Sequence, residues 1–185
     1  EENISGANVR MLQIIADNTQ RIDQIIKDVL ELNRRDRTHP EKIVLSEFIV
    51  DFHAQFCAVE KIPASNFQLN PCTQLHAITF DRRHLMQILW NLCKNGWEHS
   101  RKQVGSLSLH CTEVGKSGIN IEVTDDGDGV AEQDRSKLFE PFYTTKTTGN
   151  GLGLYISREL AEANSSLLTY QALKQGSAFI LQLKI

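Results

Sequence analysis

The sequence predicts an α/β fold of the α+β kind, a two-layer sandwich in which helices pack on a mixed, mostly antiparallel sheet. Three observations lead to this prediction: helical and strand patterns interchange along residues 43–185, the chain closes on a hairpin pattern, and an amphipathic helix comes first. At 185 residues and 41% hydrophobic content, the chain can bury one core and carry a small appendage. We expect a helical unit over residues 1–36, a linker over 37–42 and one domain over 43–185.

The first unit is expected to be one amphipathic helix, because apolar residues recur in it at heptad spacing. One heptad position holds Ile4, Met11, Asn18, Ile25 and Leu32, and the complementary position holds Ile15, Ile22 and Val29. Leu12 and Ile26 widen the stripe beyond a two-stranded seam, which suits a helical bundle. The stripe packs either on the rest of this chain or on other helices, and a sustained heptad favours the second.

The remaining elements follow from local patterns. Pro40 ends the first helix, because it disfavours helical geometry in the residue before it. Ser46 and Asp81 are expected to cap the next two helices. In order, the patterns predict strands at 42–45, 66–69, 76–80, 106–114, 118–124, 166–174 and 177–184, helices at 46–59, 82–100 and 151–163, and a loop-rich stretch over 125–150.

Composition excludes several classes of function. A net charge of −3 argues against broad electrostatic binding of nucleic acid, although a local basic pocket for phosphates is compatible with it. No apolar run approaches the roughly 18 to 20 residues of a membrane span, so we expect no membrane contact and a cytoplasmic location. Cys57, Cys72, Cys93 and Cys111 form no C-x-x-C pair, which predicts reduced thiols and no zinc site. Because the chain opens in mid-pattern without Met, we read it as a piece of a longer protein.

Asn91 and Asn95 are four residues apart on the predicted third helix, so they share one face of it. A neutral amide oxygen can bind Mg²⁺, which also accepts phosphate oxygens and water. Taken alone, the pair is more typical of polar residues on a solvated helix surface.

Asp125 follows a strand pattern and precedes Gly127 and Gly129. A buried carboxylate at a strand end can accept a hydrogen bond from the exocyclic amine of adenine, and glycines let the backbone approach the base. The alternative is an acidic hairpin turn.

A second glycine cluster, Gly-Asn-Gly-Leu-Gly-Leu at 149–154, leads directly into a helical pattern. Backbone amides at such a helix start attract phosphate, and the helix dipole adds to the attraction. The alternative is a plain helix N-terminus. Lys146, just before the cluster, is a candidate contact to a terminal phosphate or a solvated loop lysine.

In this order, segments 91–95, 125–129, 138–143 and 149–154 resemble the N, G1, F and G2 boxes of the histidine kinases. Their ATP-binding domain belongs to a superfamily that includes Hsp90 chaperones, type II topoisomerases and MutL-type repair proteins. Residues 18–32 also resemble the second helix of the kinases' dimerisation hairpin. The resemblance therefore covers essentially the whole chain, and the lid sequence resembles the subgroup that regulates nitrogen metabolism or type IV pili.

The resemblance implies a Bergerat-type ATP-binding fold with ATP and Mg²⁺ as cofactors. It implies that Asn95 is the Mg²⁺ ligand, that Asn91 lies close to the phosphates and that Asp125 reads adenine, while Phe139 and Phe142 anchor a lid. We expect Asn91, Asn95 and Lys146 to act in catalysis. The expected nucleotide-binding residues are Asn91, Asn95, His99, Asp125, Gly127, Gly129, Lys146, Gly149, Gly151, Leu152 and Gly153.

Two features depart from the family pattern. Many histidine kinases have Lys and then Tyr where this chain has Glu98 and His99, and Glu98 cannot act as a cation. Lys94 or Lys146 is then the candidate replacement, or phosphate affinity is lower. Moreover, no histidine of this chain lies in an H-box context, and His39 lies at a break after the helix. The phosphate acceptor is therefore expected outside these residues.

The function implied by the resemblance is that of a sensor histidine kinase, in which the γ-phosphoryl group of ATP passes to a histidine outside this chain. It implies a response regulator receiver domain as partner and a homodimer formed through the dimerisation hairpin. One alternative is ATP hydrolysis of the Hsp90 or MutL type, but those proteins carry a Glu at the Asn91 position to activate water. The other is a nucleotide-sensing scaffold without kinase activity.

Overall fold

The computed structural model describes residues 6–34, 38–72, 76–115, 118–146 and 149–184. The elements in chain order are α1 (Gly6–Arg34), β1 (Pro40–Val44), α2 (Leu45–Glu60), a 3-10 turn η1 (Ala64–Asn66), β2 (Phe67–Asn70), β3 (Ala77–Asp81), α3 (Arg82–His99), β4 (Leu107–Val114), β5 (Gly118–Asp125), α4 (Glu132–Arg135), α5 (Gly153–Ala163), β6 (Leu167–Ala172) and β7 (Ser177–Lys184). Short α4 lies within the stretch for which only loop was expected.

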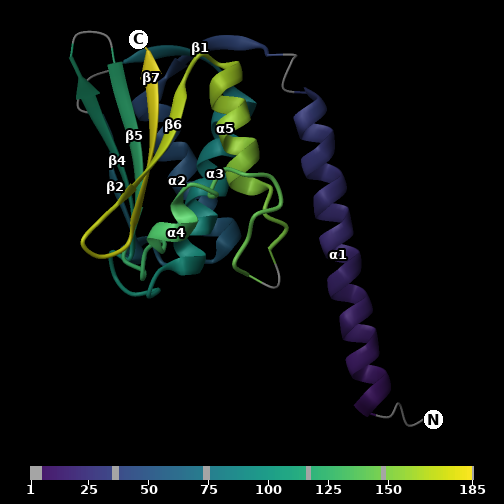
Figure 1. The fold of residues 1–185 in the computed structure, drawn as a ribbon. Helices are drawn as coiled ribbons and strands as arrows, with labels where there is room; N and C mark the ends of the chain where they lie inside the picture. Colours follow the sequence, from purple (N-terminus) through teal and green to yellow (C-terminus); the bar gives the residue numbers. More distant parts are fainter. Residues whose placement is uncertain (1–5, 35–37, 73–75, 116–117, 147–148, 185) are drawn as a thin grey trace.

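The strands form a five-stranded sheet and a small separate ribbon. The sheet has the order β2-β4-β5-β7-β6, in which β2 and β4 are parallel and the other neighbours are antiparallel. β1 and β3 form the antiparallel ribbon. Helices α2, α3 and α5 lie together beside the sheet, as Figure 1 shows. The predicted two-layer sandwich with a mixed, mostly antiparallel sheet is confirmed.

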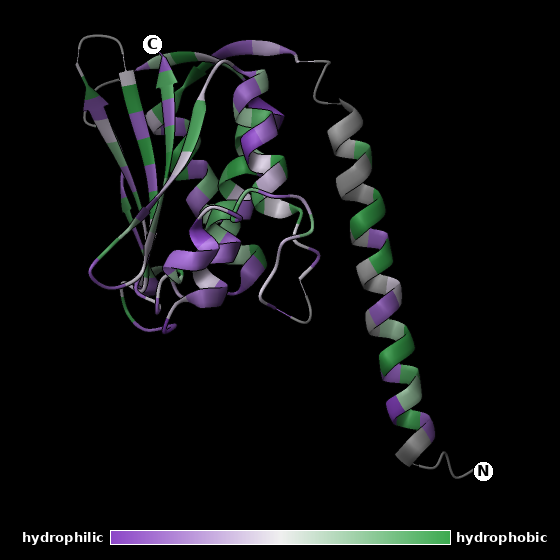
Figure 2. Ribbon diagram, viewed as in Figure 1, coloured by the Kyte–Doolittle hydropathy of each residue, from purple (hydrophilic) through white to green (hydrophobic). Residues whose placement is uncertain are grey.

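The core lies between this sheet and the helices. Hydrophobic and hydrophilic residues alternate along the strands (Figure 2), as expected for strands with one covered face. In β5 the buried hydrophobic positions are Ile119, Ile121 and Val123. They pack in one cluster with Leu89 of α3 and Leu160 of α5, both of which are fully buried. The pattern therefore fixes which face of the sheet receives the helices.

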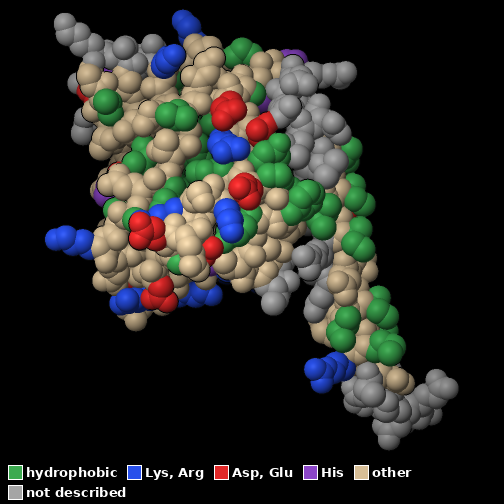
Figure 3. Space-filling model, viewed as in Figure 1, with side chains coloured by type: hydrophobic (Ala, Val, Ile, Leu, Met, Phe, Trp, Pro, Cys, Tyr) green, Lys and Arg blue, Asp and Glu red, His purple; other side chains and the backbone are tan. Residues whose placement is uncertain are grey.

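Helix α1 leaves most of its apolar stripe open. Ile25 packs against the core, and α1 contacts α5. Met11, Leu12, Ile15 and Ile22, in contrast, are 56–63% exposed, and hydrophobic side chains follow the helix in Figure 3. Ile4 and the side chains of Val29 and Leu32 lie outside the described part of the structure. Among the helices described, none combines the length and apolar character needed to cross a membrane.

Asp81 joins three parts of the domain, and its predicted capping role is confirmed. Its carboxylate, almost completely buried, accepts hydrogen bonds from the first-turn amides of Arg83 at 2.9 Å and His84 at 3.3 Å. It also accepts one from the backbone of His39, at 2.8 Å. Burial acts to raise the pKa of Asp81, but these backbone donors outweigh it and lower the pKa. The Asp81 amide in turn donates to Asn164 Oδ1, at 2.9 Å, just beyond α5.

The expectation that Ser46 caps α2 is wrong. The helix begins one residue earlier, at Leu45, and its cap residue Val44 makes no side-chain capping bond. The Leu45 amide donates to the backbone carbonyl of His76, at 2.9 Å, before β3. The start of α2 is thus held by the backbone just before β3 and not by a capping side chain.

The expectation that all four cysteines are reduced thiols is also wrong. Cys72 and Cys111 form a disulfide with a Cα–Cα distance of 4.9 Å, whereas Cys57 and Cys93 are free. The parallel pairing of β2 with β4 sets Asn70 opposite His110, so the residues that follow β2 lie beside Cys111. Sequence spacing could not reveal this proximity, because it depends on the register of two distant strands.

We expect Asp81→Ala to lower the free energy of unfolding by about 1–2 kcal/mol at pH 7, because the cap of α3 and the hydrogen bond from the His39 backbone are lost. The pKa of Asp81 is lower in the folded state than in the unfolded state, so the ionised carboxylate stabilises the fold. This stabilisation is fully present above the unfolded-state pKa of about 3.9 and is lost as the pH falls through the folded-state pKa. Urea unfolding of both proteins at pH 7 and pH 3 checks this. Asp51→Ala, on the exposed surface of α2, is the control, and equal stability of the Asp81 variant and the unmodified chain at pH 7 would contradict the prediction.

Candidate functional site

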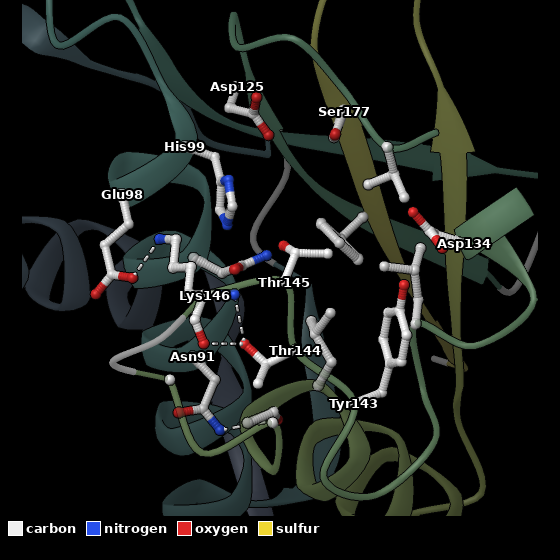
Figure 4. Close-up of a pocket in the computed structure, with 18 of the residues that line it drawn as sticks. Asn91, Glu98, His99, Asp125, Asp134, Tyr143, Thr144, Thr145, Lys146 and Ser177 are labelled. Atoms are coloured by element: carbon white, nitrogen blue, oxygen red, sulfur yellow. Dashed lines mark hydrogen bonds and ion pairs between the residues drawn. The ribbon is translucent and has the colours of Figure 1, made fainter. Parts of the chain in front are cut away.

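A cavity of about 630 Å³ opens between α3, the start of α5 and the loops after β5 and α4. Asp125 and Ser177 lie at one end of it and Asn91 at the other, with Glu98, His99 and Lys146 along one side (Figure 4). The predicted nucleotide-binding residues that line it are Asn91, Asn95, His99, Asp125, Gly129, Lys146, Gly149, Gly151 and Gly153. The fold therefore brings together residues spread over 63 positions of sequence, from 91 to 153.

Helix α3 presents Asn91 and Asn95 to the cavity from one face, as their spacing predicts. The Asn91 side-chain amide donates to the Gly153 carbonyl at 3.2 Å and to Ser157 Oγ at 3.3 Å. Ser157 is fully buried and itself donates to Gly153 O at 2.8 Å. Asn91 thus connects α3 to the first turn of α5, in addition to facing the cavity.

Asp125 is the last residue of β5 and is 8% exposed. Its carboxylate accepts a hydrogen bond from the Gly127 amide at 2.9 Å and another from the backbone of Ser177, the residue opposite it in β7. Burial raises its pKa, the backbone donors oppose the shift, and Asp126 adds to it. Two fixed donors therefore orient a desolvated carboxylate at the cavity wall, where it can accept a hydrogen bond from a ligand amine.

Two of the predicted residues do not line the cavity, for physical reasons. Gly127 is needed where two backbone segments meet, because a Cβ on it would collide with the carbonyl oxygen of His99. Leu152 is 1% exposed, with its side chain in the core. Its amide donates to Asn150 Oδ1 at 3.1 Å, which shapes the chain as it enters α5.

The N-terminus of α5 points its first amides at the cavity. The helix begins at Gly153, which lines the cavity together with Leu154, and its cap residue Leu152 supplies no side-chain acceptor. Gly151 has φ of +69° and packs against the backbone of Phe142, where a Cβ would collide. A helix start of this kind carries partial positive charge and unpaired N–H groups, so it can bind an anion.

The loop between the two glycine segments is anchored by one of the two expected phenylalanines. Phe139 packs edge-on against Phe179 with ring centroids 6.4 Å apart, and the Arg158 guanidinium lies 5.4 Å from its ring centroid. Phe142 is 64% exposed, so its expected anchoring role is wrong. Its φ of +65° and the close approach of its backbone to Gly151 turn the side chain outward.

Asp134 and Tyr143 also line the cavity, although neither was predicted as a site residue. Asp134 lies on α4, a four-residue helix too short to produce a periodic pattern. The Tyr143 hydroxyl is hydrogen-bonded to the Asp134 carboxylate, and this bond, with a smaller effect of desolvation, raises the pKa of Tyr143. The contact connects α4 to the loop that follows Phe142.

Opposite charges meet at the side of the cavity formed by α3. Lys146 Nζ lies 2.7 Å from Glu98 Oε2. Burial lowers the pKa of the adjacent His99, Lys146 lowers it further and Glu98 opposes the shift, so His99 presents a neutral ring at pH 7.

Carboxylates outnumber cations along the cavity. The charged lining residues are Lys94, Lys146, Glu98, Asp125, Asp128 and Asp134. A metal cation that accompanied a polyanion such as a triphosphate would offset this excess of negative charge. Within the described ranges, no group of three or more His, Cys, Asp or Glu side chains is placed to hold a metal. The amide oxygen of Asn95 is the donor type that fits Mg²⁺, an ion that takes few protein ligands and completes its shell with water and phosphate.

Comparison with known proteins agrees with this geometry. Residues 80–185 match the family described as histidine kinase-, DNA gyrase B-, and HSP90-like ATPase. The chain is 34% identical over 186 residues to the sensor protein kinase PilS of Pseudomonas aeruginosa, covering 95% of this chain and 33% of PilS. It thus spans about one third of that relative's length.

Two solved structures extend the match. The catalytic domain of histidine kinase ThkA superposes with a TM-score of 0.69 at 25% identity, covering 80% of this chain and 98% of that domain. The Acinetobacter baumannii histidine kinase AdeS, at 19% identity, shares the fold over 100% of this chain and 85% of its own, with a TM-score of 0.69. The family match spans more than half of the chain and includes all the cavity-lining segments. The chain therefore belongs to the family of histidine kinase-, DNA gyrase B- and HSP90-like ATPases and is homologous to the sensor histidine kinases among them.

Proposed function

We propose that this chain is the ATP-binding catalytic part of a sensor histidine kinase, which transfers the γ-phosphoryl group of Mg-ATP to a histidine outside residues 1–185. One observation carries the proposal. A single cavity combines a buried carboxylate suited to adenine, a pair of asparagines suited to Mg²⁺ and phosphate, and an uncapped helix N-terminus. The similarity to sensor kinases such as PilS supports it.

At the base end, Asp125 selects adenine. Its carboxylate is held by the amides of Gly127 and Ser177 and accepts a hydrogen bond from the exocyclic amine. Because Asp125 is desolvated, an amine that bonds to it gains more than it would in water. A base that has a carbonyl oxygen in place of the exocyclic amine would set that oxygen against the Asp125 carboxylate. Both groups are acceptors, so such a base is rejected.

At the phosphate end, the chain supplies positioning and positive potential. The first amides of α5 bind the phosphates, Asn91 lies beside them, and Lys146 contacts the terminal phosphate. Asn95 holds Mg²⁺, which neutralises phosphate charge when bound. Phosphoryl transfer of this kind needs little covalent help from the protein, and the acceptor imidazole is itself the nucleophile.

The acceptor histidine is proposed to lie outside residues 1–185, and α1 is proposed to take part in dimerisation. The exposed apolar stripe of α1, with Met11, Ile15 and Ile22 in it, suits packing in a dimerisation hairpin bundle that forms a homodimer. The receiver domain of a response regulator is the proposed downstream partner, and the cytoplasm is the proposed location of this part.

Two other functions are weaker candidates. ATP hydrolysis of the Hsp90 or MutL type needs a base beside the attacking water, and the Asn91 amide cannot be that base. A nucleotide-sensing scaffold without kinase activity has one observation in its favour, because Glu98 pairs with Lys146 and so competes with phosphate for it.

We expect Asp125→Asn to weaken binding of a non-hydrolysable Mg-ATP analogue about tenfold or more, because a hydrogen bond to a charged group contributes about 1.5–3 kcal/mol. Isothermal titration calorimetry measures this. Asp128→Asn removes a charge from the same cavity without touching the proposed adenine contact, so it should leave affinity within about twofold. Equal losses in both variants would contradict the adenine-reading role.

We expect Mg²⁺ to raise the affinity of the unmodified chain for ATP about tenfold. Asn95→Ala should remove most of this gain, because the proposed protein ligand to the ion is lost. The measurement is calorimetric titration with and without Mg²⁺. Asn120→Ala, on the far face of β5, serves as the control and should keep the Mg²⁺ dependence. Full Mg²⁺ dependence in the Asn95 variant would rule out this ligand.

We expect label from γ-³²P-ATP to pass to a supplied dimerisation hairpin that carries an acceptor histidine, and none to remain on this chain, since its own histidines lie outside an acceptor context. The product should be alkali-stable and acid-labile, as a phosphoramidate is, and Asp125→Asn should abolish the transfer. Saturable nucleotide binding with no transfer to any related hairpin would favour the scaffold.

A further inference from the structure

The ion pair between Glu98 and Lys146 connects the last turn of α3 to the loop in front of the second glycine segment. The two charged atoms are 2.7 Å apart, and both residues line the cavity. The side chains are 43% and 29% exposed, respectively. The pair therefore lies at the cavity's edge, where water and ligand both reach it (Figure 4).

Lys146 belongs to a tight turn, so its position is shared by its neighbours. Thr144 Oγ1 accepts a hydrogen bond from the Lys146 amide at 3.1 Å and donates one to the Lys146 carbonyl at 3.3 Å. Gly149 packs against this turn, since a Cβ on it would lie 2.8 Å from Thr144 Oγ1. The group that binds Lys146 therefore also fixes the position of this turn. Through the turn it fixes the start of the glycine segment that leads into α5.

We propose that Glu98 is a positioning residue that acts as a latch: it holds Lys146 and the loop in place in the nucleotide-free chain and yields Lys146 to the terminal phosphate of a nucleoside triphosphate. The proposal rests on the proposed function of the cavity. It makes Glu98 a determinant of nucleotide affinity and of the preference for triphosphate over diphosphate.

Three features of the site support the exchange. A partly exposed ion pair contributes little net stability, so a ligand can displace it. A terminal phosphate carries more negative charge than one carboxylate, so Lys146 gains by changing partner. Once released, the Glu98 carboxylate stays beside the bound polyanion and repels it. A diphosphate lacks the γ-phosphate that would reach Lys146, so Lys146 keeps Glu98 as its partner.

The latch is tested first without nucleotide, by hydrogen–deuterium exchange of residues 143–146 and 149–152. We expect Glu98→Gln and Lys146→Met each to raise exchange of these amides several-fold in the nucleotide-free chain. Glu140→Gln removes an exposed carboxylate from the same loop and should change nothing. Unchanged exchange in both pair variants would overturn the latch, whatever the chain binds.

The exchange of partners is tested by binding. We expect Glu98→Gln to tighten a non-hydrolysable Mg-ATP analogue about three- to fivefold and ADP by less than about twofold. In a Lys146→Met background the same substitution should tighten the triphosphate analogue clearly less, because only the repulsion by Glu98 is then removed. Equal tightening in both backgrounds would mean that Glu98 acts by repulsion alone and would overturn the proposal. Weaker binding of the Mg-ATP analogue by the Glu98→Gln variant would also overturn it.

Failure of the proposed function gives a different result. If the unmodified chain binds no adenine nucleotide, the proposed function and the exchange of partners are both overturned. The loop measurement would still decide whether Glu98 and Lys146 hold the nucleotide-free structure together.

Discussion

The cavity exists because α5 is fastened to α3 at both of its own ends, once at the start of α3 and once near the middle of α3. At one end, the Asp81 amide donates to Asn164 Oδ1 beyond the last turn of α5. At the other, the Asn91 side chain donates to the Gly153 carbonyl in the first turn. The two helices therefore run antiparallel, and the N-terminus of α5 always lies beside the asparagine-bearing face of α3. The remaining features of the site are built on this pairing.

The electrostatics of the cavity follow from where each charge is anchored. Asp125 is fixed by β5 and β7 and has little water around it, so it suits a neutral donor such as an amine. Lys146 is carried by a loop and already has a carboxylate partner. The carboxylate at the rigid end of the cavity therefore fits the proposed base site, and the cation carried by the loop fits the proposed phosphate site. Glu98 and a bound polyanion would compete for the same Lys146 ammonium group.

What the sequence could predict was local. The cap by Asp81, the shared face of Asn91 and Asn95, and the strand-end position of Asp125 follow from patterns within a few residues of each. What it could not predict depends on contacts between distant segments. Glu98 meets Lys146 across 48 positions, and the Cys72–Cys111 pair depends on strand register. Phe142 turns outward because Gly151 lies against its backbone. The residues next to Phe142 in the sequence do not indicate that contact.

The same helix that carries the asparagines also links the cavity to the N-terminal part of the chain. At its start, Asp81 binds the His39 backbone, which belongs to the segment between α1 and the domain. At its end, Glu98 holds the loop through Lys146. An 18-residue helix is about 27 Å long and bends little, so it moves as one body. Helix α3 therefore connects the loop, through Glu98 and Lys146 at its end, to the segment that holds His39, through Asp81 at its start.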